Sequence, residues 1–403
     1  MSPMRDRRFA LLVAGQAVNG IGSWCALIAM WGYAAYRFDA SPAQIALVTL
    51  TWSLPPALFG FLGGVPVDRY GPRRVLVLAD LAAAAIAVGM AFTTSLSQLL
   101  VGGLLLGFAR VFAEPAFTAL PPRLVPDDQL LRANAWMGAA HQIAIAIGPL
   151  VAAASIALFG LRAAFLIDAV TYLVGVAVVL PLAMGAAGIP TERVGVVAEV
   201  REGIEIVRAR PDVLRLFLLG GSVYLVWGAY AVVEPLYVRD VLGRSETTFA
   251  LLQSVFGIAL VTNGLLVPRI GERVARLGTV RLAALASGLA AILYLGTDNL
   301  VVAALGVGVW GGATAWFVVP QRTLVQRATP MSAHGRVLAI DSALRSWGHV
   351  IAMPLTALLV ELGGVRLGAF AFAAIPVALA LWLRTRPAPS PRVSAAEPVT
   401  SRS

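Results

Sequence analysis

Hydrophobic and polar positions along the chain form long apolar runs that short, arginine-rich stretches separate. Most runs reach the roughly 20 residues that an α-helix needs to cross a hydrocarbon core about 30 Å thick. Only helices and closed barrels satisfy their backbone polar groups in lipid, and the runs lack the alternation of barrel strands. The pattern predicts an all-α polytopic membrane protein with twelve transmembrane helices. The predicted helices span residues 9–34, 43–65, 75–94, 97–118, 133–158, 163–183, 214–237, 248–267, 279–295, 300–319, 337–361 and 367–383.

The longest internal loop, residues 184–213, carries apolar residues at helical spacing among charged ones. This spacing predicts an amphipathic helix on the cytoplasmic membrane surface. The loop divides the chain into an N-terminal six-helix bundle, 1–183, and a C-terminal six-helix bundle, 214–386. The tail at 387–403 is rich in proline, serine and alanine, and we expect it to be disordered.

The two predicted bundles repeat part of their sequence at an offset of 200 residues. Residues 64–71 read Gly-Val-Pro-Val-Asp-Arg-Tyr-Gly, and residues 264–271 read Gly-Leu-Leu-Val-Pro-Arg-Ile-Gly. The glycines and the arginine coincide, and each segment follows the second helix of its bundle. Parallel repeats about an axis along the membrane normal are a known transporter architecture.

The composition excludes a soluble enzyme of ordinary make-up. Hydrophobic residues make up 59% of the 403 residues and charged residues 13%, whereas soluble domains carry about 25% charged residues. Twelve spans leave room for short loops but not for a separate soluble domain.

The positive charge is carried by arginine alone, with 31 basic residues and no lysine. A P-loop requires lysine, as does a retinal or pyridoxal Schiff base, so these chemistries are excluded. Of the loop arginines, 24 fall on one side of the predicted membrane and 5 on the other. The positive-inside rule then predicts cytoplasmic N- and C-termini, and we expect the chain to lie in the cell's inner (cytoplasmic) membrane. This distribution accounts for the net charge of +10 without a nucleic-acid partner.

The residues that catalysis commonly uses are few. The chain has three dispersed histidines and one cysteine, Cys25, with no metalloprotease, serine-hydrolase or metal-ligand spacing. We therefore expect no enzyme activity, no metal site and no cofactor.

The segment after the second predicted helix combines glycine, acid and arginine in a recognisable order. It reads Gly64-x-x-x-Asp68-Arg69-x-Gly71-x-Arg73-Arg74. This motif resembles the signature loop of the major facilitator superfamily, whose members have twelve helices in two bundles. The resemblance implies the major facilitator fold, transport of a small molecule across the lipid bilayer, and a monomer.

Further stretches resemble the macrolide-efflux and enterobactin-exporter branch of that superfamily. They are Pro115-Ala116, Leu124-Val125-Pro126, Ala133-Asn134, Ile167-Asp168-Ala169, the segment 235–243 and Gly335-Arg336-Val337. Gly148-Pro149 resembles an element of antiporters, although Ala152-Ala153 replaces the glycine pair that follows it in that element.

The resemblance implies that Asp68 accepts hydrogen bonds from the start of helix eleven, near Arg336, and so holds the cytoplasmic side shut in the outward-open state. Either Arg73 or Arg74 would pair with an acid in helix four, and Glu114 fits by depth. Pro72 stands where the family often has a basic residue. The alternative is that these arginines only set the topology.

Ionisable residues inside spans are costly and are functional candidates by default. Asp80 lies one to two turns from the cytoplasmic end of its helix, and we interpret Asp168 as a helix-start contact. His141 is a weaker candidate in helix five. The proton-coupling candidates are Glu114, Glu234, Arg110, Asp341, Arg345 and His349. The i,i+4 spacing also allows two of their pairs, Arg110–Glu114 and Asp341–Arg345, to be purely structural.

In the superfamily, helices one, four, seven and ten line the central cavity. By this resemblance, the substrate-lining candidates are Gln16, Asn19, Tyr224, Trp227, Trp310 and Trp316, with Trp24 and Trp31 ranked lower. Aromatic rings beside an acid suit bulky amphipathic or cationic substrates. Tryptophan belts at membrane interfaces are the alternative explanation.

The leading hypothesis is a secondary active transporter that exports a bulky amphipathic molecule in exchange for protons by alternating access. A drug, a macrolide or a siderophore would be such a molecule. The alternatives are a lipid flippase, an uptake symporter of the same fold, a membrane enzyme or receptor, and a transporter-like scaffold that does not transport.

Overall fold

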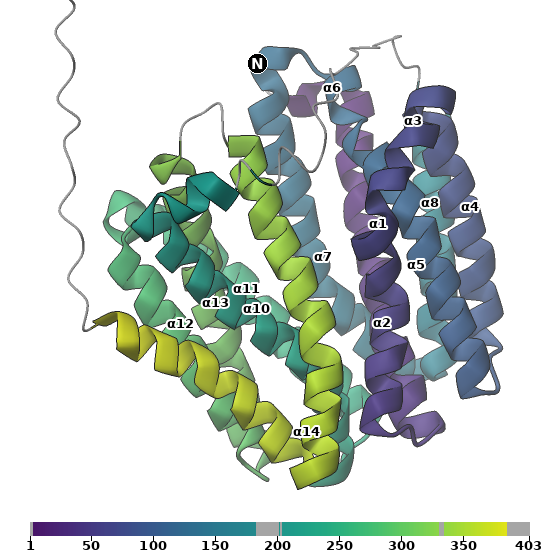
Figure 1. Ribbon diagram of the computed structural model, residues 1–403. Coiled ribbons are helices and arrows are strands. Elements are labelled where there is room, and N and C mark those ends of the chain that lie inside the picture. The colour runs from purple at the N-terminus through teal and green to yellow at the C-terminus, as the bar shows by residue number, and fades with distance from the viewer. Residues whose placement is uncertain (1–2, 183–200, 202–203, 330–333, 385–403) are drawn as a thin grey trace, which may run out of the picture.

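The computed structural model describes residues 3–182, 201, 204–329 and 334–384 (Figure 1). These residues form helices joined by short turns, and no strand occurs among them. Eleven of the helices are long and apolar enough to cross a membrane. The last of these, Ile340–Leu383, contains Gly363 and Gly364, whose backbone dihedral angles are not helical, so it comprises two spans. The predicted all-α fold with twelve transmembrane helices is confirmed.

The helices form two groups that lie side by side (Figure 1). We call residues 3–182 the N-half and residues 204–384 the C-half. The N-half comprises α1 (Arg7–Gly32), α2 (Pro42–Phe59), α3 (Gly64–Tyr70), α4 (Pro72–Ala91), α5 (Leu96–Thr118), α6 (Pro121–Leu124), α7 (Leu130–Phe159) and α8 (Leu161–Val179). The C-half comprises α10 (Pro211–Leu236), α11 (Glu246–Ile270), α12 (Leu277–Leu295), α13 (Leu300–Ala328) and α14 (His334–Arg384).

The first helix of each half ends in the same way. A π-helical turn, Tyr33–Arg37, follows α1, and another, Tyr237–Val241, follows α10. Such turns are rare and occur often at functional sites.

Side-chain caps mark the start of two helices. Ser41 forms a capping box with Gln44 before α2, and Asn299 caps α13.

The signature segment is helical rather than a loop. After a 3-10 turn at Gly60–Gly63, the chain continues directly as α3 and breaks only at Gly71. Gly71 has φ 82°, and its repeat partner Gly271 has φ 75°. Glycine adopts this left-handed region without the clash that a Cβ causes, so the repeated glycines allow the same break in both halves.

The structure corrects the end of the tenth predicted helix, and it describes only part of the predicted linker. The tenth predicted helix ends at residue 319, but α13 continues past Pro320 to Ala328. Neighbouring helices and local adjustment satisfy the backbone group that a proline frees in a membrane helix, so proline is a poor stop signal there. Of the predicted amphipathic linker, 184–213, residues 201 and 204–208 are helical and residues 211–213 already belong to α10. Residues 184–200 and 202–203 of the linker and the tail from 385 lie outside the described residues.

The buried side chains form one shared core and two separate ones. The shared core joins residues of both halves, including Met30 and Phe165 from the N-half and Tyr230 and Phe249 from the C-half. It lies toward the end that carries Arg37, Arg162, Arg239, Arg244 and Arg366, which we call the arginine-poor end.

At the opposite end each half has a core of its own, centred on Phe9 in the N-half and on Phe217 in the C-half. This end carries Arg5, Arg69, Arg73, Arg74, Arg269 and Arg273, and we call it the arginine-rich end.

Candidate functional site

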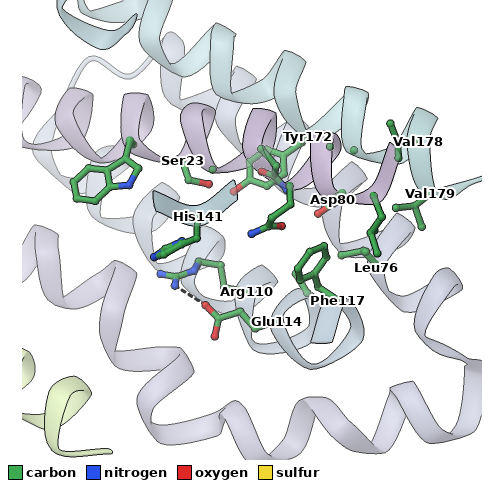
Figure 2. Close-up of a pocket in the computed structure, with 18 of the residues that line it drawn as sticks. Ser23, Leu76, Asp80, Arg110, Glu114, Phe117, His141, Tyr172, Val178 and Val179 are labelled. Carbon is green, nitrogen blue, oxygen red and sulfur yellow. Dashed lines mark hydrogen bonds and ion pairs between the residues drawn. The ribbon is translucent and has the colours of Figure 1, made fainter. Parts of the chain in front are cut away.

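A cavity of about 350 Å³ lies in the N-half, toward the arginine-rich end (Figure 2). Helices α1, α2, α4, α5, α7 and α8 line it. Its lining residues are Leu12, Gly15, Gln16, Asn19, Gly20, Ser23, Trp24, Leu27, Trp52, Leu76, Asp80, Arg110, Ala113, Glu114, Phe117, His141, Tyr172, Gly175, Val178 and Val179. The lining combines apolar and aromatic surface with a few charged groups, as ligand pockets generally do.

Glycines set the approach of α1 to the helices around it. A Cβ on Gly20 would lie 2.6 Å from the Ala144 side chain of α7, and one on Gly148 would lie 2.5 Å from that of Trp24. Contacts this short require the absence of a side chain. The close packing places the Trp24 ring against α7 and inside the cavity wall.

Arg110 and Glu114 form the ion pair of the cavity, with Nη2 and Oε1 2.5 Å apart (Figure 2). The Arg110 guanidinium also lies over the Trp52 ring, 4.6 Å from its centroid. Both side chains of the pair are partly exposed, at 31% and 53%, so a ligand in the cavity can reach them. The predicted i,i+4 contact is confirmed.

The pairing of Glu114 with Arg73 is not formed in this conformation. Arg73 Nη1 donates instead to the Leu182 carbonyl oxygen at 3.0 Å, beyond the end of α8. Arg74 is exposed, and the Arg69 guanidinium lies 5.3 Å from the Tyr70 ring centroid. The contact of Asp68 with the start of α14 stays a prediction, since the side chain of Arg336 lies outside the described residues.

The C-half holds a second arginine–acid pair, and its predicted i,i+4 contact is also confirmed. Arg345 Nη2 lies 3.0 Å from Asp341 Oδ2, and Gln321 Nε2 donates to Asp341 Oδ1 at 3.0 Å. The Arg345 guanidinium lies over the Tyr224 ring at 5.1 Å. Asp341 is buried, whereas 41% of the Arg345 side chain is exposed.

Glu234 of α10 is buried in the shared part of the molecule. Gln253 Nε2 of α11 donates to its Oε2 at 2.5 Å, and Oε1 has no hydrogen-bond partner among the described residues. The Tyr230 hydroxyl and the Trp310 indole nitrogen are likewise buried without a partner, and the two rings lie 4.7 Å apart.

The predicted substrate-lining residues do not come together. Gln16 and Asn19 line the cavity of the N-half. Trp227 instead stacks on His349 at 6.1 Å within the C-half, and Trp316 donates to Asn263 Oδ1 at 3.1 Å. Trp310 is 4% exposed. In this conformation Trp227 and Trp310 pack against other aromatic rings of the C-half, and neither lines the N-half cavity.

Sequence reasoning missed several cavity residues. Trp52, Phe117 and Tyr172 line the cavity, and so does Asp80, for which depth in the helix alone predicts no particular role. Their hydropathy resembles that of ordinary membrane-span residues, so the sequence carries no direct signal for the three aromatic ones. For Asp80, the rarity of an intramembrane carboxyl group was the available signal.

Asp168 does not make a helix-start contact, so that interpretation was wrong. It lies two turns inside α8, which begins at Leu161 after Gly160, and neither carboxylate oxygen has a hydrogen-bond partner among the residues that the structure describes.

Contacts between the halves seal the arginine-poor end. Arg239 Nη1 donates to the Ala35 carbonyl oxygen at 2.7 Å and lies 2.9 Å from Asp39 Oδ1. The Tyr36 hydroxyl donates to the Pro235 carbonyl oxygen at 3.5 Å. These contacts join the π-helical turns that follow α1 and α10.

Comparison with protein families confirms the resemblance drawn from the signature motif. A family model described as Major Facilitator Superfamily matches residues 12–223 and residues 216–402.

Macrolide efflux protein A of Streptococcus pyogenes is 24% identical over 372 residues, covering 89% of this chain and 90% of its own length. The multi-drug resistance efflux pump PmrA of Streptococcus pneumoniae is 24% identical over 307 residues, covering 74% and 75%. These relatives agree with a macrolide-efflux-like branch, and they are transporters rather than enzymes.

Solved structures of transporters share the fold. A D-xylose-proton symporter matches with a TM-score of 0.72 at 16% identity, covering 94% of this chain and 97% of that one. A bacterial homologue of the human lysosomal transporter Spinster, in an inward-facing and unoccupied conformation, matches with a TM-score of 0.68 at 17% identity, covering 95% of each chain.

Proposed function

Because the chain belongs to the major facilitator superfamily, we propose that it exports bulky amphipathic small molecules in exchange for protons. The substrate class is that of drugs, macrolides or siderophores. The protein works by alternating access as a monomer in the inner (cytoplasmic) membrane, with both termini in the cytoplasm. Macrolide and multidrug efflux proteins among its relatives support this choice over uptake or lipid flipping.

One observation carries the proposal. The N-half cavity contains a partly exposed Arg110–Glu114 pair beside aromatic rings, and it lies toward the end where each half has its own core. The opposite end is closed by contacts between the halves. An exporter in this state receives its substrate from the arginine-rich, cytoplasmic side. The amphipathic lining suits a ligand with a large apolar body and few polar groups.

Glu114 is the more exposed of the two acids that line the cavity, at 53% against 3% for Asp80. A cationic group of the substrate competes with Arg110 for its carboxylate, and an anionic group competes with Glu114 for the guanidinium. Either competition opens the Arg110–Glu114 pair, whose charged atoms are in contact in this structure. Glu234 and the Asp341–Arg345 pair then exchange their contacts when the C-half rearranges.

The direct test is proton release from inverted membrane vesicles with an acidic interior. A pH-sensitive dye reports the interior while erythromycin, ethidium or a siderophore is added. Substrate-evoked loss of acidity is expected for wild type and is expected to be lost in Asp68→Asn and Glu114→Gln. Asp212→Asn is the matched control, because this acid lies at the start of α10, away from the cavity.

The outcomes separate the hypotheses. Proton release that survives Glu114→Gln would move the coupling role to Glu234. Absence of a response to every compound, in sealed vesicles that contain folded protein, would contradict proton-coupled efflux. A fluorescent-lipid assay would then test the flippase alternative.

A further inference from the structure

Two carboxyl groups of the N-half take no part in the ion pairs described above. Asp168 of α8 has no exposed surface, and within the described part of the chain neither of its carboxylate oxygens has a hydrogen-bond partner. Asp80 of α4 is 3% exposed and lines the cavity. Among the described residues, no arginine or histidine forms an ion pair with either carboxyl group.

Two glycines make room for these carboxyl groups. A Cβ on Gly22 of α1 would lie 2.9 Å from Asp168 Oδ1, so this carboxyl group lies against the α1 backbone. A Cβ on Gly175 of α8 would lie 3.1 Å from Asp80 Oδ2 and 3.9 Å from the Asn19 side-chain nitrogen. Both acids therefore lie beside the packed helices α1 and α8. Asp80 lies on the cavity side, and Asp168 lies against α1, outside the cavity lining.

The surface between the two acids is polar. Asp168, Tyr172 and Gly175 follow one another at spacings of four and three residues, so they share one face of α8. Tyr172 faces Ser23 of α1, and both line the cavity (Figure 2). Asn19 Oδ1 is also buried without a hydrogen-bond partner among the described residues. Polar side chains of α1 and α8 thus lie between Asp168 and the cavity.

No charged side chain in the described ranges forms an ion pair with either acid. The titratable and charged groups on the packed elements are Cys25 on α1, Tyr172 on α8, Arg110 and Glu114 on α5, and His141 on α7. Arg110 is the only arginine among the cavity-lining residues that the structure describes, and Glu114 pairs with it.

An ionised carboxylate without a donor or counter-ion costs several kcal/mol to bury, whereas a protonated carboxyl group is tolerated. We propose that Asp168 and Asp80 form a pair of proton-binding sites in the N-half. At Asp80, a proton from a hydronium ion in the cavity water forms an O–H bond with the carboxylate and leaves a water molecule, and the reverse step returns the proton to water. Asp168, which has no exposed surface, holds its proton as a neutral carboxyl group. Only the link between this pair and transport rests on the proposed function. The binding of protons does not.

Infrared spectroscopy of the purified full-length protein in lipid tests proton binding without any substrate. The probe is the proton itself, read from the carbonyl stretching band of protonated carboxyl groups during a pH titration. Asp168→Asn is expected to lower the intensity of this band, and Asp80→Asn to alter its titration. Asp212→Asn, an exposed aspartate outside the cavity, is the matched control and should leave the band unchanged.

An unchanged band in monodisperse Asp168→Asn protein of wild-type helical content would overturn the assignment of this group. If Asp168→Asn does not fold, Asp80→Asn decides the matter: an unchanged titration of the band would refute the pair.

Transport assays connect the pair to the proposed function. In proteoliposomes with radiolabelled erythromycin, both Asp→Asn variants are expected to lose accumulation driven by a pH gradient and to keep exchange at equal pH. Retained gradient-driven accumulation would refute a role of the pair in proton coupling. Absence of exchange in wild type would count against the proposed substrate class, while the infrared result would stand.

Discussion

The two ends of the molecule differ in how the halves meet. At the arginine-poor end, α1, α2, α10 and α11 contribute to one buried core, and Arg239 bonds across it to Ala35 and Asp39. At the arginine-rich end the buried side chains separate into one cluster for each half. The halves therefore share one buried core at the arginine-poor end, whereas at the arginine-rich end the core of each half is separate.

This difference shows where the free energy of the conformational change resides. Opening the arginine-poor end exposes buried apolar area, which costs about 25 cal/mol per Å², and breaks a few polar contacts. Closing the arginine-rich end has to recover a comparable free energy by burying apolar area there. Asp39 has φ 45° and adopts the left-handed region that non-glycine residues rarely occupy. It therefore marks a strained position at the closed end.

The largest effect is expected from preventing the arginine-poor end from opening. In a Cys25→Ser background, the paired substitutions Arg37→Cys and Asp240→Cys, at exposed positions of the two π-helical turns, allow a flexible, cleavable thiol cross-linker to join those turns. Transport of erythromycin in vesicles should be abolished by the cross-linker and restored by its cleavage. Each single-cysteine variant is the control. Full transport in the cross-linked protein would mean that this end does not open during the cycle.

A moderate effect is expected from weakening the same contact. Arg239→Gln removes an ion pair and a charged hydrogen bond between the halves, together worth about 1–2 kcal/mol. The population open at the arginine-poor end should rise about five- to thirtyfold. Spin-label distances across this end measure that population.

Arg366→Gln is the matched control for this measurement. Arg366 pairs with Asp298 at the same end, but both residues belong to the C-half. An equal shift in the two variants would show that general loss of charge, rather than the contact between halves, determines the equilibrium.

The smallest effect is expected at the arginine-rich end. The hydrogen bond from Arg327 lowers the pKa of the exposed Glu272 below its ordinary value of 4.5. Because the pKa is lower in the folded state, the stabilisation is present above pH 4.5 and is lost as the pH falls through the folded-state value. Melting curves of wild type and Glu272→Gln should differ slightly at neutral pH and converge in acid.

Transport should be nearly unchanged in Glu272→Gln, since Glu272 and Arg327 belong to the same half. A large loss of transport would show that this pair also acts between the halves, and the contrast between the two ends would be weakened.

Contacts within one helix and the repeated glycines could be predicted from the sequence. The spacing of Arg110 from Glu114, and of Asp341 from Arg345, was enough to predict both pairs, because contacts four residues apart follow from helix geometry alone. Gly71 and Gly271 were visible as a repeat, and both adopt positive φ.

Contacts between distant segments were not predictable in this way. Asp168 and Asp80 are 88 positions apart in the sequence, and only the packing of α8 against α1 and α4 relates them to one cavity wall. Trp227 and Trp310 were expected to line a cavity, but rings from α10, α11 and α14 pack against them. The conformational state decides whether such rings face a cavity, and hydropathy does not encode that state.

The sequence by itself determined the membrane class, the helices, the repeat and the family, because hydrophobic length, arginine distribution and a local motif are properties of contiguous residues. Only the tertiary structure decided which end is closed, which acids have partners and which aromatic rings face the cavity. Each of these depends on small differences in packing between helices that are far apart in the chain, and local sequence does not specify those differences.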